Sequence, residues 1–142
     1  MGTSFAHVLE MRAKLAMPAA LWLKMQHGVY AEFATIGAVV ELGSIVLTGL
    51  LAFLVRNDRR LFLYTAMATA LIAVGFFGVW LIATNPVNAK TAVWTPSSIP
   101  EDWADWRSQW KYSHLLRFVL HLIALSLLVL AILPRRARGP YV

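Results

Sequence analysis

Long apolar runs separated by short polar segments dominate the sequence. Three of these runs, residues 30–55, 61–83 and 113–133, can each cross a bilayer as a helix, because a helical span needs about 20 mostly apolar residues. The segment between the second and third runs, residues 84–112, is polar and rich in tryptophan. The pattern predicts an all-α integral membrane bundle with three full spans and a short N-terminal helical segment.

Composition supports this class of protein and excludes others. Of the 142 residues, 59% are hydrophobic and 14% are charged, which is too apolar for an ordinary soluble domain of this length. The chain has no cysteine, so disulfides and thiolate-held metal or haem sites are excluded. Its basic residues gather at the ends of the apolar runs, a pattern typical of a protein in a lipid bilayer and not of a nucleic-acid partner. We expect a single membrane domain.

The same charges predict an orientation. The turn Arg56–Arg60 and the tail Arg135–Arg138 are separated by two spans, and both are basic. Basic loops stay on the cytoplasmic side, so we expect this turn and the C-terminus in the cytoplasm of a bacterium, with the spans in its inner membrane. The acidic and aromatic connection 84–112 is then external.

One helix face gathers the polar residues that enter the third span. At 100° per residue, this stripe falls within an arc of about 100°. Its members are Trp103, Trp106, Arg107, Trp110, His114, Arg117 and His121. The stripe predicts that its deeper members share a face that is turned toward the other spans.

The first two spans differ in polarity. Glu41 lies well inside the first, where an acid costs about 3 kcal/mol unless it finds a partner. We therefore expect Glu41 to point into the bundle, within reach of an arginine, histidine or amide side chain. The second span looks structural, and we expect Asn85-Pro86 to end its helix because proline disfavours helix continuation. The third span is expected to begin near Tyr112.

Short motifs along nearly the whole chain resemble one family. They are Ser4–Glu10, Lys14-Leu15, Trp22-Leu23, Asn85-Pro86-Val87-Asn88, and Trp103, Trp106-Arg107, Trp110, His114 and Arg117. Together they resemble the anthrone-oxygenase-like family of small four-helix membrane proteins, most of which have no assigned reaction. Family members usually have a complete helix that ends in a segment like Ser4–Glu10. Here we expect either a chain that starts late or a three-span variant closed by His7 and Glu10, which share a helix face.

The resemblance implies a site at the external end of the bundle, where a hydrophobic aromatic molecule is bound or oxidised. His114 and Arg117 are the candidate catalytic residues: His114 deprotonates an anthrone carbon, and Arg117 stabilises the enolate charge. The carbanion can then react with oxygen without a metal or another cofactor. The candidate substrate-binding residues are Glu41, Asn85, Asn88, Trp106, Arg107, Trp110, His7 and Glu10.

Two other interpretations stay open at this point. In the first, the tryptophans form an interfacial belt, the ionic residues pair, and the chain is a non-catalytic subunit or scaffold held to a membrane partner or a second copy. In the second, histidines and carboxylates hold a metal or haem. No Glu-x-x-His pair lies on a span, and His114 and His121 are two helical turns apart. We therefore predict no metal site.

Overall fold

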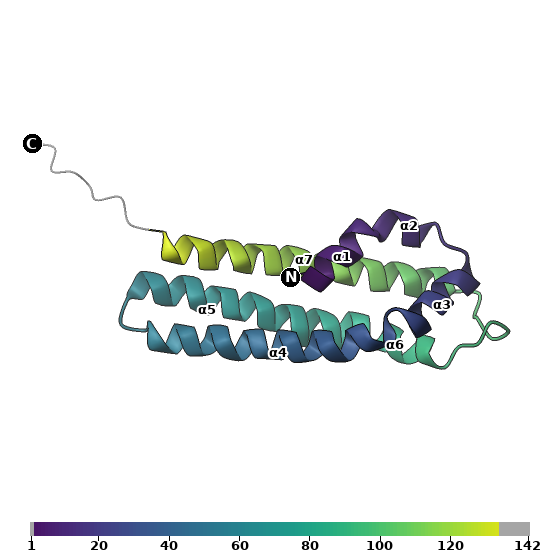
Figure 1. Cartoon of the computed structure of the whole chain (residues 1–142), viewed down its shortest axis with the longest axis horizontal. Coiled ribbons are helices and arrows are strands. Elements are labelled where there is room, and N and C mark those ends of the chain that lie inside the picture. The colour runs from purple at the N-terminus through teal and green to yellow at the C-terminus, as the bar shows by residue number, and fades with distance from the viewer. Residues whose placement is uncertain (1, 134–142) are drawn as a thin grey trace, which may run out of the picture.

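The computed structural model describes residues 2–133, the side chains at 31 and 32 excepted, and in this range helix is the only regular secondary structure (Figure 1). Three stretches are long and apolar enough to cross a membrane: Phe33–Leu54, Arg59–Ala92 and Trp103–Ile132. Short helices precede them. The predicted fold class is thus confirmed: an all-α membrane bundle with three spans and a short N-terminal helix.

The first span is α4 (Ala31–Leu54), and many of its large apolar side chains lie on the outside of the bundle. Such side chains suit contact with lipid. After the turn at residues 55–58, Asp58 caps the next helix by accepting hydrogen bonds from the backbone N–H groups of Arg60 (2.9 Å) and Leu61 (3.1 Å). The short polar linker therefore defines the start of the second span.

The second span is a single rod made of three consecutive pieces. These are α5 (Arg59–Ala73), the π-helix η1 (Val74–Thr84) and α6 (Asn85–Ala92). The π-helix pairs each carbonyl with an N–H five residues on, and its last such bond runs from the Asn85 N–H to the Trp80 carbonyl.

The predicted helix end at Asn85-Pro86 is therefore wrong. Pro86 lies in the first turn of α6, where a missing N–H and a fixed φ are tolerated. At this junction the Gln109 side chain donates a hydrogen bond to the Ala83 carbonyl (2.9 Å), which gives that oxygen a further partner. The non-helical part of the connection shrinks to residues 93–102.

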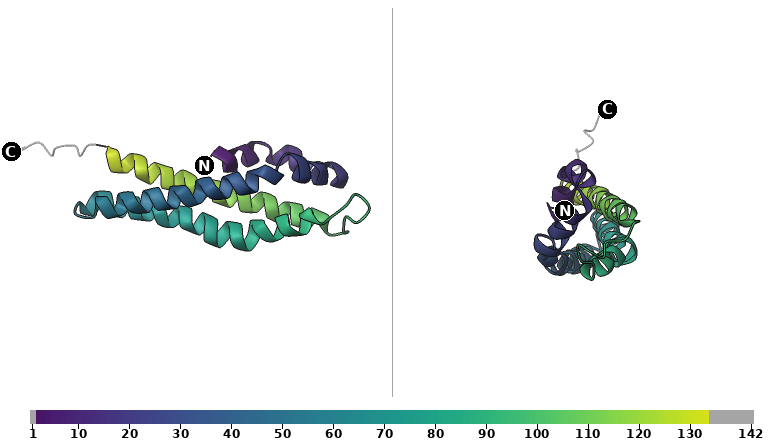
Figure 2. Two further views of the ribbon diagram at one scale, coloured as in Figure 1. Left: turned by 60° about the horizontal axis from the view of Figure 1, so that its bottom comes forward. Right: turned by 90° about the vertical axis from the view of Figure 1, so that its right-hand side faces the viewer.

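The third span lies within α7 (Trp103–Ile132), whose first turns precede the apolar run and carry the tryptophans of the stripe. Both α4 and α7 pack against the second rod, whereas contact between α4 and α7 is slight. In Figure 2 the N-terminal helix α1 (Gly2–Leu9) lies over the seam between them, and it packs mainly on α7. The helices α2 (Met11–Leu15) and α3 (Ala19–Gly28) complete this end of the bundle.

An aromatic cluster closes the end of the bundle that α1, α2 and α3 cover. Trp22 is its most buried member, with ring centroids 6.1 Å from Trp94 and 6.2 Å from Trp103. Val87 and Trp110 complete the buried part of the cluster. Several of the tryptophans that the sequence suggested as an interfacial belt are thus packed against one another, and they anchor the short helices to α6 and α7.

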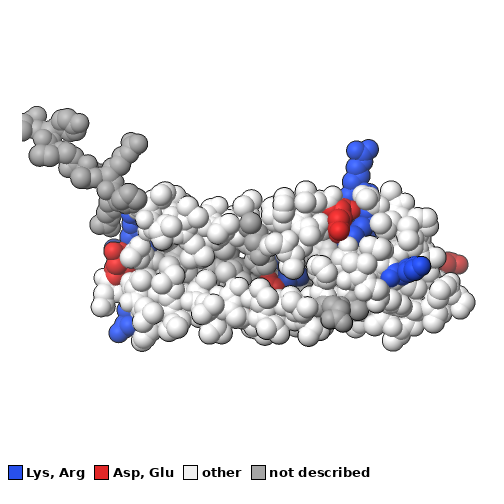
Figure 3. All heavy atoms as spheres, in the orientation of Figure 1, with Lys and Arg blue, Asp and Glu red and all other residues white. Residues whose placement is uncertain are grey.

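Charged side chains gather at the two ends of the bundle and leave the middle apolar (Figure 3). The end opposite α1 carries Arg56, Asp58, Arg59 and Arg60. An acidic and a basic group also lie at mid-length in Figure 3. Glu41 of α4 and Arg117 of α7 form an ion pair near the middle of their helices. The fold thus places charge at two depths on the α1 side of the seam: at the end and in the middle.

Candidate functional site

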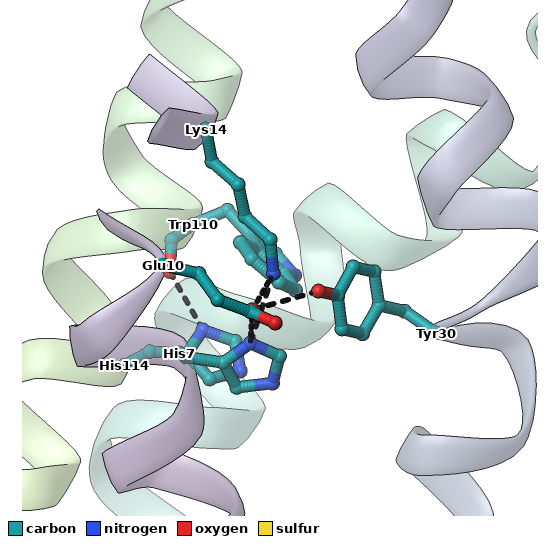
Figure 4. A network of polar contacts seen from close by, with 6 residues as sticks. All are labelled: His7, Glu10, Lys14, Tyr30, Trp110 and His114. Atoms are coloured by element: carbon teal, nitrogen blue, oxygen red, sulfur yellow. Dashed lines mark hydrogen bonds and ion pairs between the residues drawn. The ribbon is translucent and has the colours of Figure 1, made fainter. Parts of the chain in front are cut away.

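The N-terminal helix brings two buried histidines together. His7 on α1 and His114 on α7 have ring centroids 4.2 Å apart, with their planes at 70° (Figure 4). Trp110 touches both, at 4.8 Å from His7 and 4.2 Å from His114. The predicted approach of the N-terminal segment to His114 is confirmed.

Hydrogen bonds fix which nitrogen of each ring is protonated. The Nδ1 of His114 lies 2.7 Å from the Trp110 carbonyl, which can only accept, so Nδ1 carries the proton and Nε2 keeps a lone pair. The Nδ1 of His7 lies 3.5 Å from the Lys14 ammonium, a donor, and therefore has its lone pair there. Burial and then the Lys14 charge lower the pKa of His7 to about 3. The 3.9 Å approach of His7 to Glu10 is accordingly not an ion pair at neutral pH.

Glu10, Lys14 and Tyr30 form the outer part of this cluster. The Lys14 ammonium donates to the Glu10 carboxylate and lies 3.7 Å from the Tyr30 ring centroid, and the Tyr30 hydroxyl donates to the same carboxylate at 2.8 Å. Burial would raise the pKa of Glu10, but the bonds from Lys14 and Tyr30 bring it below its usual value. Burial, and secondly the bond to Glu10, raise the pKa of Tyr30. The carboxylate is thus held as the anion.

Two buried lysines belong to the cluster although the sequence did not predict them there. Lys14 is 2% exposed and Lys111 is 1% exposed, and the Lys111 ammonium has no hydrogen-bond partner among the described residues. The signal for Lys111 was its helical spacing, three residues before His114, although it lies about 40° beyond the edge of the stripe. With Glu10 as the single acid in contact, basic groups outnumber acidic ones. We call His7, Glu10, Lys14, Tyr30, Trp110, Lys111 and His114 the end cluster.

A cavity and a larger pocket adjoin the end cluster. The cavity has about 40 Å³ of room, and its lining includes His7, Trp110, His114 and Arg117. This is space for a few water molecules. The pocket has about 360 Å³ of room between α3, α4 and α6. Both spaces are lined by Tyr30, Ala34 and Asn88. A molecule in the pocket therefore reaches the end cluster past these three residues.

A second cluster lies one to two helical turns deeper, at mid-membrane depth. Arg117 donates to the Glu41 carboxylate, and the Nε2 of His121 lies 2.8 Å from the other carboxylate oxygen. That second contact departs from hydrogen-bond geometry, so it is an electrostatic contact. Trp110 and His114 are buried on the same face of α7. Both predictions, an inward-pointing Glu41 and a shared inward face of the deeper stripe, are confirmed. We call Glu41, Arg117 and His121 the middle cluster.

Other predicted substrate-binding residues take different positions. Asn88 lines the cavity and accepts a hydrogen bond from the Trp110 indole at 2.8 Å, whereas Asn85 is exposed on α6 and does not line it. Arg107 donates to the carbonyl of Met17 (2.6 Å), which ties α7 to the segment before α3. Trp106 donates to Asp102 (2.9 Å) and has the Lys90 ammonium 3.6 Å from its ring centroid. Arg107 and Trp106 thus hold the end of the bundle together and do not line the cavity.

Comparison of the chain with protein-family models, with curated proteins and with solved structures returns no match. The resemblance to the anthrone-oxygenase-like family thus stays a prediction. Within residues 2–133, no three or more His, Asp and Glu side chains are grouped to hold a metal ion. The chemistry of the end cluster is therefore the feature that bears on function.

Proposed function

We propose that this chain binds a small hydrophobic aromatic molecule with an ionisable oxygen, such as an anthrone, and that His114 removes a proton from it. The observation that carries the proposal is the excess of buried basic groups in the end cluster. Lys14 and Lys111 are buried beside Glu10, the one acid of that cluster. A buried cation without a partner is costly, and an enolate or phenolate would supply the missing negative charge.

The sizes of the two spaces decide how such a molecule would sit. The cavity, at about 40 Å³, accepts the oxygen-bearing edge of a ligand but not a fused ring system. The adjoining pocket, at about 360 Å³, falls in the size range of small-molecule sites. We infer that the rings occupy the pocket and that the oxygen passes Tyr30 and Asn88 toward the lysines.

The free Nε2 of His114 is the base in this proposal, because its Nδ1 proton is committed to the Trp110 carbonyl. It takes the proton from the hydroxyl group of the enol form of an anthrone, and buried positive charge stabilises the resulting enolate oxygen. Molecular oxygen, the oxidant, then forms a carbon–oxygen bond to the ring carbon opposite this oxygen, and the proton returns to the outer oxygen to give a hydroperoxide. Loss of water, with cleavage of the O–O bond and the remaining C–H bond, leaves the second carbonyl of an anthraquinone.

We also propose that the ligand is taken up on the external side of a bacterial inner membrane. Arg56, Arg59 and Arg60 lie at the opposite end of the bundle from the end cluster, and the rule of positive charges inside assigns such a turn to the cytoplasm. The tail Arg135–Arg138, which carries the same signal, lies outside the described residues. Labelling of a single cysteine placed in the 56–60 turn, in intact cells, tests this orientation.

The test of function is turnover of anthrone by the protein in lipid nanodiscs, followed by oxygen uptake and by anthraquinone absorbance. His114→Asn is the informative variant, since its amide N–H replaces the Nδ1 donor to Trp110 while the basic Nε2 is lost. We expect a fall of about 100-fold or more in rate, typical of a removed general base. Tyr112→Phe, at an exposed residue of α7 that lines neither the cavity nor the pocket, is the control.

Two outcomes would contradict the proposal. Oxidation by the parent protein no faster than in empty nanodiscs, together with no binding of anthrone, would eliminate the function. A His114→Asn protein as active as the parent would eliminate His114 as the base. Lys111→Met, which removes a charge and keeps the length of the side chain, should weaken anthrone binding and leave the helix content unchanged.

A further inference from the structure

The middle cluster contains several buried polar atoms without a hydrogen-bond partner among the described residues. They are Oε1 of Glu41, Nε of Arg117, and both Nδ1 and Nε2 of His121. Each unsatisfied buried group costs about 1 to 3 kcal/mol. Two of them, Oε1 of Glu41 and Nε2 of His121, face each other at 2.8 Å outside hydrogen-bond geometry. The other two, Nε of Arg117 and Nδ1 of His121, have no partner among the described residues in the middle of an apolar bundle, which indicates that water or an ion completes the site.

The charges of the middle cluster show where a proton can be added. Arg117 balances the Glu41 carboxylate, so the pair is neutral. The Nε2 of His121 lies 2.8 Å from Oε1 of Glu41, and two lone pairs would repel at that distance, so Nε2 carries a proton. The Nδ1 of His121 then has an unused lone pair. It is the one atom of the cluster that can take up a proton without breaking a contact.

Space for water adjoins this atom. A cavity of about 110 Å³, lined in part by Glu41, Ser44 and His121, holds several water molecules. Thr3 and Gly37 line both this cavity and the one beside the end cluster. A polar route thus leads from the α1 end of the bundle to mid-membrane depth.

The opposite direction is closed by apolar side chains. The next hollow toward the Arg56 end has about 340 Å³ of room, and it is lined almost entirely by aliphatic side chains of α4, α5 and α7, including Leu51 and Val129. Water and ions are costly in such surroundings. This hollow therefore offers water no polar partner between the Arg56 end and the middle cluster.

The second span leaves room for the His121 ring at this depth. Gly75 lies one residue into the π-helix, and a Cβ added to it would lie 3.1 Å from Nε2 of His121 and 3.7 Å from Oε1 of Glu41. A π-helix inside a longer helix is often found at functional sites. Any larger residue here would push the imidazole away from the carboxylate.

We infer that His121 is a proton-binding site within the membrane, which takes up a proton at Nδ1 from water that enters at the α1 end. The charged groups that face His121 are Glu41 from α4 and Arg117 from its own helix. The neighbours from the other elements, Ile72 and Gly75 of the second span and Thr3 of α1, are uncharged. This inference does not depend on the aromatic ligand or on His114.

The test is NMR of the protein labelled with ¹⁵N-histidine, in nanodiscs, over a series of pH values. The chain has four histidines, and the signals lost in His121→Gln identify those of His121. We expect them to change reversibly from the neutral to the imidazolium pattern while the helix content stays constant. In Glu41→Gln, where Arg117 has no counter-charge, the same ring should stay neutral. His121 signals that do not change with pH in the parent protein would overturn the inference.

The route of the proton is tested by blocking the junction of the two cavities. Gly37→Leu places a bulky side chain where they meet, and Gly43→Leu on the same helix is the control, because neither added Cβ has an atom within 4 Å. After a rapid pH step, Gly37→Leu should lose the fast phase of proton uptake at His121, and Gly43→Leu should keep it. Equal rates in the two variants would overturn entry from the α1 end.

Discussion

The end cluster and the middle cluster are both ionic, yet they are built differently. Short helices supply much of the end cluster, and basic groups outnumber acidic ones there. Long spans supply the middle cluster, where Glu41 and Arg117 cancel each other. In an apolar bundle the two charges of a balanced pair neutralise each other. A cluster with an excess of basic groups is instead stabilised when it binds an anion. Charge balance therefore separates the two clusters more clearly than burial does.

The largest predicted effect comes from breaking the balance of the middle cluster. Arg117→Leu leaves Glu41 buried and unpaired, and we expect the free energy of unfolding to fall by about 3 to 5 kcal/mol. The double variant Glu41→Leu/Arg117→Leu removes both charges and should regain much of that loss. The free energies of unfolding of the single and the double variant are measured in mixed detergent micelles, with circular dichroism as the signal.

The matching change in the end cluster should cost less. Lys14→Met also leaves a carboxylate without its cation, but the Glu10 side chain is 45% exposed and keeps water as a partner. We expect a loss near the value for solvent-screened pairs, about 1 kcal/mol or below. Equal losses for Lys14→Met and Arg117→Leu would contradict the comparison of the two clusters.

The second prediction concerns pH and the end cluster. The pKa of His7 is about 3 in the folded protein against 6.5 for a free histidine, so between these values the unfolded chain binds a proton that the folded chain does not. Stability should therefore fall as the pH drops below 6.5, with a contribution of about 1.4 kcal/mol per pH unit at most. The pKa of Glu10 is also lowered in the folded protein, so the free energy of unfolding falls further as this carboxylate is protonated at more acidic pH.

Detergent unfolding at a series of pH values tests this dependence. His7→Gln should flatten the curve between pH 6.5 and about 3. A parent curve that is flat over the same interval would show that His7 is not held neutral by its surroundings.

The spans and the inward direction of Glu41 were predictable because each follows from one local rule. A run of about 20 apolar residues must cross the membrane or be buried in the protein. A carboxylate within such a run needs a hydrogen-bond or ion-pair partner. The stripe on the third span was predictable for the same reason, since helical spacing alone decides which residues share a face. These features do not depend on how the short helices dock.

The errors arise where tertiary contacts override a local rule. Proline disfavours helix continuation, but Pro86 lies in the first turn of α6, directly after a π-helix. No local sequence pattern predicts this π-helix. Lysines are expected at the surface, yet Lys14 and Lys111 are buried because α1 and α2 fold back onto α7. The contact of His121 with Glu41 could not be predicted either, since it depends on the position of Gly75 on another span.

The third prediction uses that glycine to test the tight fit of the middle cluster. Gly75→Ala should be destabilising relative to Gly43→Ala by about 1 to 2 kcal/mol, because its Cβ would crowd the His121 ring, whereas the Cβ at Gly43 meets no atom within 4 Å. In solvent-exposed helices the exchange of glycine for alanine gains about 1 kcal/mol, so Gly43→Ala also reports the background effect of the exchange. Equal midpoints of unfolding for the two variants would mean that the second span shifts enough to accommodate the His121 ring.

An effect as small as that of Lys14→Met is predicted for another residue in the outer part of the end cluster. Tyr30→Phe removes a hydroxyl that donates to Glu10 at 2.8 Å, and the partly exposed carboxylate can take a water molecule in its place. We expect a loss of about 1 kcal/mol, the usual net value of one hydrogen bond. Tyr112→Phe, at an exposed tyrosine on α7, should have no effect and is the matched control. A loss for Tyr30→Phe as large as that for Arg117→Leu would mean that Glu10 is sealed from water, and the two clusters would then differ in charge balance alone.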